Sequence, residues 1–339
     1  MTKNRLAIIV LNWNGADDTI KCIESLEAQT LRPTIVVVDN ASSDDSVTQI
    51  SRYIKSAQSD IILIENSVNS GYTGGNNIGF RRALDDGYRY IGTLNPDAVA
   101  DKHWCETLVK ELDTHPDTGI VAGILARSNH IHTDSTGDFY TTWGIPGPRG
   151  RDKLLTDAPK DAAYVFGVTG GGFITRREVF ERVGLLDERF FMYFEDVDLC
   201  FRTQLAGYKI RYQPRAIAYH KISASTNKVP GLAIKQTFKN LPILFLKNVP
   251  LRLWPHILPR FWLSYTLIFW HGVFHGRGKF VFAGWFGSLA LLPHALRERL
   301  RIQSSRNVSS DYIDSIILHD IPPEQTGLRK FRSFFTGKK

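Results

Sequence analysis

The stretch "RLAIIVLNWNGADDTIKCIESLEAQTLRPTIVVVDNASSDDSV", residues 5–47, alternates two hydrophobic patterns. An apolar run over 6–13 is followed by Ile20, Ile23 and Leu26 near helical spacing, and then by an apolar run over 34–38. A strand, a helix and a second strand at this spacing make a right-handed crossover between parallel strands. The stretch therefore predicts an α/β fold.

The same alternation continues to residue 100. The elements expected there are a helix over 44–57 capped by Ser42 or Ser43, a strand over 60–66, a glycine-rich loop "SVNSGYTGGNNIG" over 67–79, a helix over 80–90 and a strand over 90–100 that breaks at Pro96. Together they predict a doubly wound, mostly parallel, Rossmann-like sheet, in which ligands lie beyond the carboxyl ends of the strands. The polar strand ends, 12–15, 39–40, 66–75 and 95–97, are therefore expected to meet at one cleft.

Beyond residue 100 the pattern is less regular. Residues 127–161, rich in Gly, Pro, Thr and His, predict a long loop or hairpin near the cleft. An apolar strand, the triple glycine of "TGGGF" (169–173) and a helix starting near Arg177 follow. A helix over 194–205 and a strand ending at His220 complete this part of the chain.

The composition is that of a folded globular protein, with 339 residues, 43% hydrophobic and 22% charged. Cys22, Cys105 and Cys200 are far apart, which argues against a disulfide framework or a cysteine zinc site and suits a reducing cytosol. The N-terminal apolar run is short, so we interpret it as a buried strand and not a secretory signal.

The positive charge lies in the C-terminal part. Residues 241–339 hold 14 basic against 5 acidic residues, whereas the rest of the chain holds 28 against 29. Two uncharged stretches, 261–276 and 280–296, flank "RGK" and are rich in aromatic residues. Tryptophan with flanking Arg and Lys is typical of a segment at lipid headgroups, so we predict peripheral or monotopic attachment to an anionic membrane surface.

Core packing, a homodimer face and a membrane span are the alternatives for this region. Nucleic acid is not an expected partner, because the positive charge coincides with apolar sequence. We divide the chain into a catalytic domain over 1–226 (nucleotide half about 1–100, acceptor half about 101–226), a helical membrane-associating region over 227–303 and a partly disordered basic tail over 304–339.

Several strand-end side chains could bind a nucleotide. Asp39 could accept hydrogen bonds from a ribose diol or a base imide, although an Asp at a turn has the same pattern. Asp97, after the stiff Pro96, suits a divalent cation, although Asn-Pro-Asp is also an ordinary turn. The candidate nucleotide-binding set is Asn12, Asp39, Asn40, Gly71, Gly75, Asn76, Asn95 and Asp97.

The glycine-rich segment over 67–79 could cradle a pyrophosphate, but its glycines lack the dinucleotide spacing. In "FFMYFEDVDLCFR" (190–202), Glu195, Asp198 and Arg202 share a helix face and predict an ion-pair ladder. Asp196 lies about 100° round the helix and is free to project into the cleft as a general base; the alternative is a carboxylate that only stabilises the helix start. His220 could be a metal ligand or a phosphate contact, and the alternative is a structural histidine.

In their order along the chain, "VVVDNASSDDS", "NSGYTGGNNIG", "LNPDA", "TGGGFITRREVFERVGLLDERFFMYFEDVDLCFR" and His220 closely resemble glycosyltransferase family 2, above all its bacterial rhamnosyltransferase-like members. The resemblance covers about residues 5–225. It implies a GT-A fold, inverting transfer from a nucleotide-sugar donor, best dTDP-rhamnose with UDP-sugars as the alternative, and Mg²⁺ or Mn²⁺ as cofactor. A polyprenyl-linked or glycan acceptor at the cytoplasmic face of the cell membrane is also implied.

The resemblance also implies residue roles. Asp39 matches the nucleoside-binding Asp, and Asp196 the catalytic base. Asn95-Pro96-Asp97 matches the D-x-D position with Asn in place of the first Asp, so metal binding would rest on Asp97, with His220 as a looser match. The acceptor-side residues are Gly171, Gly172 and Glu195.

Two other functions stay open from the residues. A nucleotidyltransferase would carry a basic glycine-rich loop after the first strand, and "NWNGADDT" has no Lys or Arg. A non-catalytic sugar-nucleotide binder or membrane scaffold has no need of the acids at 39, 97 and 196.

Overall fold

The structure is a computed structural model that describes residues 5–57, 59–221 and 229–321. The predicted boundary at 226/227 and residues 322–339 of the predicted tail lie outside this part of the chain. The strands are β1 (Leu6–Asn12), β2 (Thr34–Asn40), β3 (Ile61–Asn66), β4 (Tyr90–Leu94), β5 (Ala98–Ala100), β6 (Thr118–Arg127), β7 (Thr133–Ser135), β8 (Asp138–Tyr140), β9 (Pro146–Pro148), β10 (Ala163–Val165), β11 (Gly172–Arg176) and β12 (Lys209–His220). The α-helices are α1 (Ala16–Glu27), α2 (Ser46–Ser56), α3 (Gly71–Asp85), α4 (Trp104–Thr114), α5 (Arg177–Val183), α6 (Glu195–Leu205), α7 (Leu232–Asn248), α8 (Trp254–Gly272), α9 (Gly278–Ala290), α10 (Leu292–Ser304) and α11 (Ser310–Ile316).

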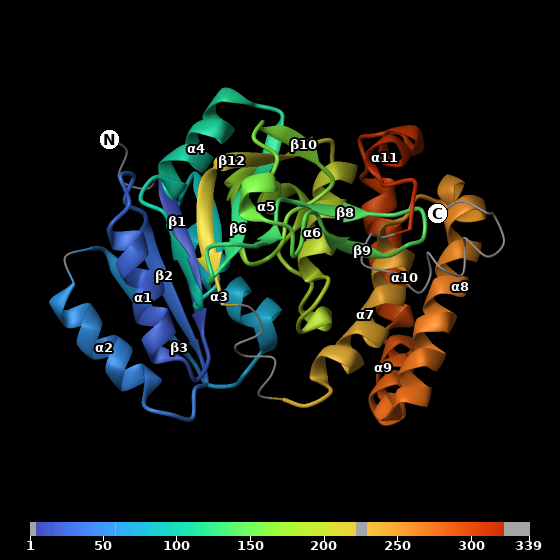
Figure 1. Cartoon of the computed structure of the whole chain (residues 1–339), viewed down its shortest axis with the longest axis horizontal. Helices are drawn as coiled ribbons and strands as arrows, with labels where there is room; N and C mark the ends of the chain where they lie inside the picture. The colour runs from blue at the N-terminus through green and yellow to red at the C-terminus, as the bar shows by residue number, and fades with distance from the viewer. Residues whose placement is uncertain (1–4, 58, 222–228, 322–339) are drawn as a thin grey trace.

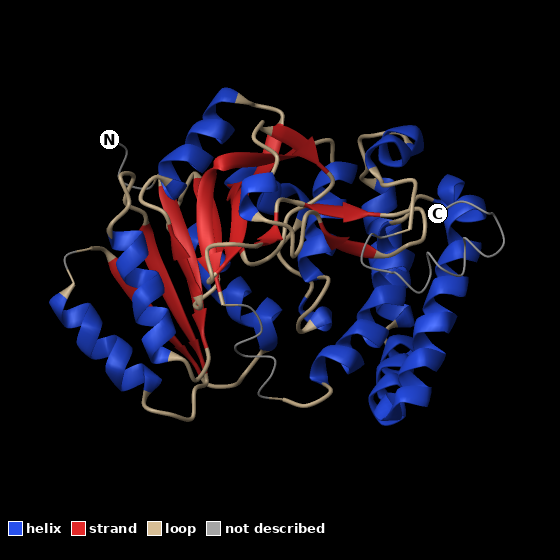
Figure 2. Ribbon diagram, in the orientation of Figure 1, coloured by secondary structure: helices blue, strands red, loops and turns tan. Residues whose placement is uncertain are grey.

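One large sheet organises the first 220 residues, with helices on both faces (Figures 1 and 2). Its strand order is β10-β12-β6-β11-β4-β1-β2-β3, with β5 and β7 paired to β12 and β6. Strands β4, β1, β2 and β3 are parallel, as are β6 and β12, whereas β11 runs antiparallel between β4 and β6. The prediction of a doubly wound, mostly parallel sheet is confirmed.

The alternation of side chains along β1 shows why both faces are covered. Leu6, Ile8 and Val10 pack with α1, α2 and α4, while Ala7 and Ile9 pack with α3, α5 and α6 on the opposite face. Successive side chains of a strand point to opposite faces, so a strand apolar at every position requires cover on both. The predicted irregular segment 127–161 contains β7 and the β8–β9 hairpin.

The prediction of a loop over 67–79 was wrong from residue 71 onward, because helix α3 begins at Gly71. Glycine disfavours helices, but here it permits contact with the sheet. A Cβ on Gly75 would lie 2.4 Å from Leu11 Cδ1, and one on Gly79 would lie 2.7 Å from Ile9. The glycines therefore let α3 lie against β1, and packing decides the local structure.

The C-terminal helices gather beside the sheet, at the end opposite β3 (Figure 1). A third apolar cluster joins them to α6: Phe201 and Phe190 are buried with Phe238, Phe261 and Tyr265. The helix that carries the three acids of 195–198 therefore packs on one side against the sheet and on the other against the C-terminal helices.

The outer sides of α8, α9 and α10 remain apolar and exposed. The exposed large side chains there are Trp262, Leu263, Leu267, Trp270, Phe274, Phe282, Phe286, Leu289, Leu292, Leu296 and Leu300. In the described part of the chain no single helix has the length and apolarity to cross a bilayer. The bent pair Leu251–Ala290 and Leu292–Ser304, at 54°, meets both criteria together.

Candidate functional site

The first group of predicted residues lies at the carboxyl ends of β1 and β2. Asn12 Nδ2 donates to Asp39 Oδ1 (2.6 Å), and Asp39 also accepts from the Ser42 hydroxyl (2.6 Å) and the Ser42 N–H (2.9 Å). These bonds use three of about four lone-pair sites of the carboxylate. Asp39, 2% exposed, is thus held rigidly with capacity for one further donor.

Ser42 does not cap the following helix, contrary to the sequence prediction. Asp45 occupies the cap position of α2 without a side-chain cap bond, and the N–H of Ser46 at the helix start donates to Asp44 Oδ1 (3.0 Å). Ser42 instead bonds to Asp39 and accepts from the Asn14 N–H (2.9 Å), while the Ser43 N–H donates to Asn14 Oδ1 (2.7 Å). The loops after β1 and β2 are therefore tied to each other.

Asn40, Gly71, Gly75 and Asn76 have packing partners. Asn40 Oδ1 accepts from the Ser70 N–H (3.1 Å), and its Nδ2 donates to the Gly71 carbonyl (3.1 Å). Asn76 is fully buried and accepts from the Thr93 hydroxyl (3.0 Å). These contacts join β2, α3 and β4. We therefore interpret these four residues as structural and do not assign them to a nucleotide-binding site.

A second group lies between β4 and β5, beside the end of β12. His220 Nε2 is 3.1 Å from Asp97 Oδ1 and 3.1 Å from Asn95 Nδ2, and its Nδ1 is 3.1 Å from Asp134 Oδ2. Burial lowers the pKa of His220, but its hydrogen bonds to Asp134 and Asp97 outweigh this and raise it to about 9. The structure therefore brings the predicted Asn95, Asp97 and His220 together.

Asp134 and Arg151 belong to this group but were missed by the sequence analysis. Asp134 is 3% exposed, and its Oδ1 is 2.9 Å from Arg151 Nη2. Burial raises the pKa of Asp134, but His220 and Arg151 outweigh it, and the pKa lies below its usual value. Both residues come from the irregular segment 127–161, where no periodicity marks one side chain over another.

A metal ion would find a partly prepared site here. Among the described residues, no group of three or more His, Cys, Asp and Glu side chains could hold a metal by itself. Asp97 and His220 Nε2 nevertheless face one another, and Asp134 on Nδ1 orients the ring as metal-binding histidines require. Mg²⁺ and Mn²⁺ commonly take few protein ligands and complete their shell with substrate phosphates and water, so the donor set fits.

The third group surrounds Asp196. Its Oδ2 accepts from the Gly170 N–H (2.7 Å), and its Oδ1 from the Val197 N–H (2.8 Å). Burial raises the pKa of Asp196, and these backbone bonds only partly offset it. A carboxylate with a raised pKa is a stronger base, and it is fixed here in one orientation.

The triple glycine links the second and third groups. Gly170 donates to Asp196, and its carbonyl accepts from the Tyr72 hydroxyl (2.6 Å). The next carbonyl, of Gly171, accepts from the Asn95 N–H (3.0 Å). Gly172 starts β11 and pairs with Leu94. One short backbone segment thus joins the acid of α6 to the break after β4.

Two more acids flank Asp196. Glu195 is 6% exposed, its Oε2 has no hydrogen-bond partner in the described part of the chain, and burial raises its pKa well above the usual value. It takes no part in the predicted ladder, whereas the Asp198–Arg202 pair forms at 2.9 Å. Asp138, missed by the sequence analysis, accepts from the Ser135 hydroxyl (2.9 Å), and burial with the charge of Asp196 raises its pKa to about 8.

All three groups lie along one edge of the sheet. The carboxyl ends of β4, β1 and β2, which are neighbours, carry Asn95, Asn12 and Asp39. The predicted meeting of the polar strand ends is therefore confirmed for these strands. A rigid polar group, an acid–histidine pair and an oriented base at one edge can bind a nucleotide and remove a proton from a second substrate.

Comparison with known proteins gives this edge a context. The family model "Glycosyl transferase family 2" matches residues 7–184, more than half of the chain. The hexosyltransferase Agl10 of low-salt glycan biosynthesis, from Haloferax volcanii, is 33% identical over 208 residues, 59% of this chain and 61% of its own length. Rhamnosyltransferase WbbL of Escherichia coli is 28% identical over 70% of this chain and 92% of its own length.

A third relative, N-acetylglucosaminyl-diphospho-decaprenol L-rhamnosyltransferase of Mycobacterium tuberculosis, is 24% identical over 67% of this chain and 79% of its own. Among solved structures, the mannosyltransferase PcManGT of Pyrobaculum calidifontis, in complex with GDP-Man and Mn²⁺, has a TM-score of 0.54 at 15% identity, covering 90% of this chain and 86% of that one. GalNAc-T7 with UDP, GalNAc and Mn²⁺ has a TM-score of 0.59 at 16% identity, covering 72% and 48%. The chain thus spans less than two thirds of Agl10 and about half of GalNAc-T7. The shared fold is GT-A.

Replacing Asp138 with Asn should change how stability depends on pH. The pKa of Asp138 rises from 3.8 to about 8 on folding, so the folded state holds a proton that the unfolded state loses. This stabilisation is present below about pH 4 and is lost as the pH rises to about 8. Between pH 5 and pH 8 the urea-unfolding free energy of the wild type should therefore fall. In Asp138→Asn this contribution to the fall should be absent.

The exposed Asp161→Asn is the matched control and should follow the wild type. Identical pH dependence in Asp138→Asn and wild type would show that Asp138 ionises normally.

Proposed function

Because this chain belongs to glycosyl transferase family 2, we propose that it transfers a sugar from a nucleotide-activated donor with inversion and that Asp196 is the general base. The observation that carries this assignment is the orientation of Asp196 by the N–H groups of Gly170 and Val197, beside the break that holds Asn95. An inverting transfer requires no enzyme nucleophile, so one positioned carboxylate is sufficient. Base assistance of this kind is typically about 10²–10⁴-fold.

In this mechanism the remaining lone pairs of Asp196 accept the proton of the acceptor hydroxyl. The hydroxyl oxygen then attacks the anomeric carbon from the face opposite the nucleoside diphosphate, which leaves with the electrons of the glycosidic bond. Asp39, with Asn12 behind it, binds the nucleoside, and Asn95 lies near the diphosphate. Glu195, Gly171 and Gly172 lie on the acceptor side of Asp196.

Asp97 and His220 would hold Mg²⁺ or Mn²⁺, with Asp134 orienting the imidazole. When bound, such an ion neutralises the charge that develops on the departing diphosphate. Support comes from the structures of GalNAc-T7 and PcManGT, both of which were solved with Mn²⁺. Asn95 supplies no carboxylate at this position, so metal binding would rest mainly on Asp97, with His220 beside it.

We also propose L-rhamnose, from dTDP-rhamnose, as the transferred sugar and a polyprenyl-linked glycan as the acceptor in cell-surface polysaccharide synthesis. Support comes from the names of the Escherichia coli and Mycobacterium tuberculosis relatives, the second of which includes a decaprenol-linked acceptor. The test is a turnover screen of dTDP-rhamnose, UDP-hexoses and GDP-mannose with Mg²⁺ or Mn²⁺. A clear preference for a UDP-hexose would replace rhamnose, and binding without turnover would favour a non-catalytic binder.

We propose further that α8–α10 attach the enzyme to the cytoplasmic face of the membrane. The exposed Trp262, Trp270 and Phe286 have Arg277 and Lys279 near them in sequence, both also exposed. Anionic lipid attracts each basic residue near the surface by about 1 kcal/mol, while the rings enter the headgroup region. Attachment would bring a lipid-linked acceptor to the enzyme.

The variant Asp196→Asn should lose transfer by roughly 10²-fold or more, because the amide cannot accept the proton at neutral pH. Nucleotide affinity should stay within about twofold. Turnover of the preferred donor and calorimetric titration with the nucleoside diphosphate measure the two effects. Near-normal turnover in this variant would rule out Asp196 as the base.

The variant Asp97→Asn should weaken Mn²⁺-dependent binding of dTDP, because it removes the one carboxylate of the proposed metal site. Titration of dTDP with Mn²⁺ and with EDTA should differ in the wild type and agree in the variant. The exposed Asp101→Asn, which follows β5, is the control. An unchanged Mn²⁺ effect in Asp97→Asn would contradict the metal assignment.

Combined replacement of Trp262, Trp270 and Phe286 by Gln should reduce co-sedimentation with phosphatidylglycerol vesicles at least tenfold. Val68→Gln, which replaces an apolar residue that is 63% exposed beyond β3, should bind vesicles like the wild type. Unaltered sedimentation of the triple variant would contradict the proposal. A wild-type dimer that the triple variant loses would assign the face to a second copy.

A further inference from the structure

Helix α7 turns a polar edge toward α6 and the segment before it. Its buried residues include Leu241, Ile243, Leu244 and Phe245, as in a core helix. Yet the buried set also includes Asn240, Lys247 and Asn248, which neither the sequence motifs nor the proposed mechanism use. Residues seven and eight apart lie on one side of a helix, so these three face the same neighbour.

Asn240 binds a strained backbone segment. Phe191, Tyr193 and Phe194 have φ values of 64°, 68° and 70°, a region that bulky residues seldom adopt. The fully buried Asn240 Nδ2 lies within hydrogen-bond distance of the carbonyl oxygens of Phe190 (3.0 Å), Met192 (2.8 Å) and Tyr193 (2.9 Å). Such conformations are strained and persist only when the surroundings hold them.

The neighbouring Lys239 supports the same segment from the same helix. Its Nζ donates to the carbonyls of Arg189 (2.9 Å) and Phe190 (3.2 Å). From the opposite side, the Thr73 N–H of α3 donates to the Phe191 carbonyl (3.1 Å). The strained segment is therefore fixed between α3 and α7 immediately before Asp196.

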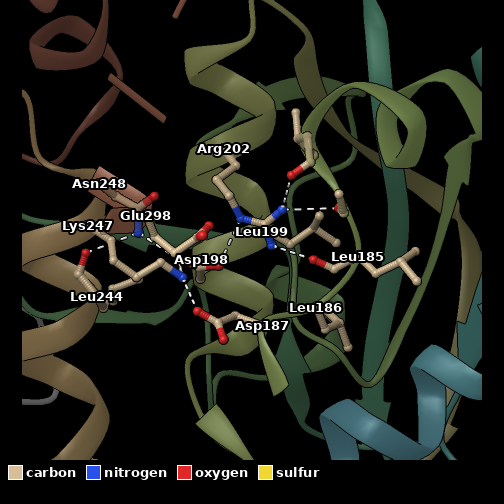
Figure 3. Close-up of polar contacts among 12 residues, drawn as sticks. Leu185, Leu186, Asp187, Asp198, Leu199, Arg202, Leu244, Lys247, Asn248 and Glu298 are labelled. Atoms are coloured by element: carbon tan, nitrogen blue, oxygen red, sulfur yellow. Dashed lines mark hydrogen bonds and ion pairs between the residues drawn. The ribbon is translucent and has the colours of Figure 1, made fainter. Parts of the chain in front are cut away.

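Lys247 and Asn248 bind Asp198, which follows Asp196 in the chain, and Figure 3 shows these contacts together with the one between Lys247 and Asp187. Lys247 Nζ is 2.9 Å from Asp198 Oδ1 and 2.5 Å from Asp187 Oδ2, and Asn248 Nδ2 donates to Asp198 Oδ1 (2.8 Å). Arg202 pairs with the other oxygen of Asp198. Asp198 and Lys247 are 0% and 1% exposed, so the pair is removed from water.

Burial of such charges is expensive, and an apolar replacement of similar volume is often as stable or more so. Stability alone therefore does not account for this pair. Asp196 lies three residues after Tyr193 and two before Asp198, and α7 binds the chain at both of these points. The arrangement restricts the short segment between them, which contains Asp196.

We propose that Asn240 and Lys247 of α7 are positioning residues for Asp196, acting through the segment 190–194 and through Asp198. The inference rests on the proposed role of Asp196 as the base. It makes α7 a part of the catalytic machinery, although the helix follows the region that the family model matches. A displacement of about 1 Å at a catalytic group can cost about 10²-fold in rate.

The test is Asn240→Leu, which keeps the volume of the side chain and removes its N–H donors. The expected result is a 10- to 100-fold lower kcat with a nucleotide Kd within twofold of the wild type, since Asp39 and Asp97 are untouched. The assay uses dTDP-rhamnose, or the donor that the screen selects, with a synthetic N-acetylglucosaminyl-diphospho-polyprenol. Circular dichroism at the assay temperature checks that the variant is folded.

Thr237→Val is the matched control on α7, because in the described part of the chain the Thr237 hydroxyl bonds to the Ala233 carbonyl of its own helix and to no other residue. It should keep wild-type kcat. If Asn240→Leu does not fold, Lys239→Met is the milder variant, with an expected three- to tenfold lower kcat and unchanged nucleotide Kd. Wild-type kcat in the folded variant, or an equal loss of kcat and nucleotide affinity, would overturn the proposal.

The two proposals can fail separately. If Asp196→Asn keeps its turnover, the base assignment fails and this inference fails with it. If Asp196→Asn is inactive while Asn240→Leu is fully active, only the positioning role is wrong.

Discussion

Two backbone hydrogen bonds made by adjacent glycines hold the candidate site together. The Gly170 N–H binds the carboxylate of Asp196, and the Gly171 carbonyl accepts from Asn95, so the proposed base and the proposed donor side share one backbone connection. A side chain would crowd this point, because a Cβ on Gly170 would lie 2.9 Å from the Tyr72 hydroxyl oxygen. The spacing of catalytic groups therefore depends on the backbone, whose geometry varies far less than that of long side chains.

Much of the fold could be predicted because the first hundred residues obey simple periodicities. Parallel strands place their carboxyl ends at one edge, so Asn12, Asp39 and Asn95 could be brought together from their positions alone. The start of α3 could not be predicted, because its glycines are poor helix formers and become helical there only through contact with β1. Asp134 and Asp138 could not be predicted either, because their segment has no repeating pattern. The position of such a side chain depends on contacts with residues far away in the chain, as in the contact of Asp134 with His220.

The charges around α6, the helix that carries the proposed base, differ from what is usual for a buried helix. Asp198, Arg202 and Lys247 are all nearly inaccessible to water, and each charge has a partner of opposite sign. Leu or Met at these positions would avoid the desolvation cost. Apolar contacts are less directional, however, and would allow the helix more than one orientation. Hydrogen bonds to charged groups are directional, and they fix the rotation of α6 about its axis as well as its distance from α7.

The two-sided contact of α7 also limits how such enzymes can be recombined. Asn240 fits the carbonyls of 190–193, and Lys247 fits acids at 187 and 198, although some fifty residues separate the partners in the chain. A chimaera that takes its C-terminal helices from one relative and its sheet domain from another would join an unmatched pair of surfaces. Segment 187–198 and helix α7 have to be inherited as one unit, so a useful crossover point lies before residue 187 or after residue 248.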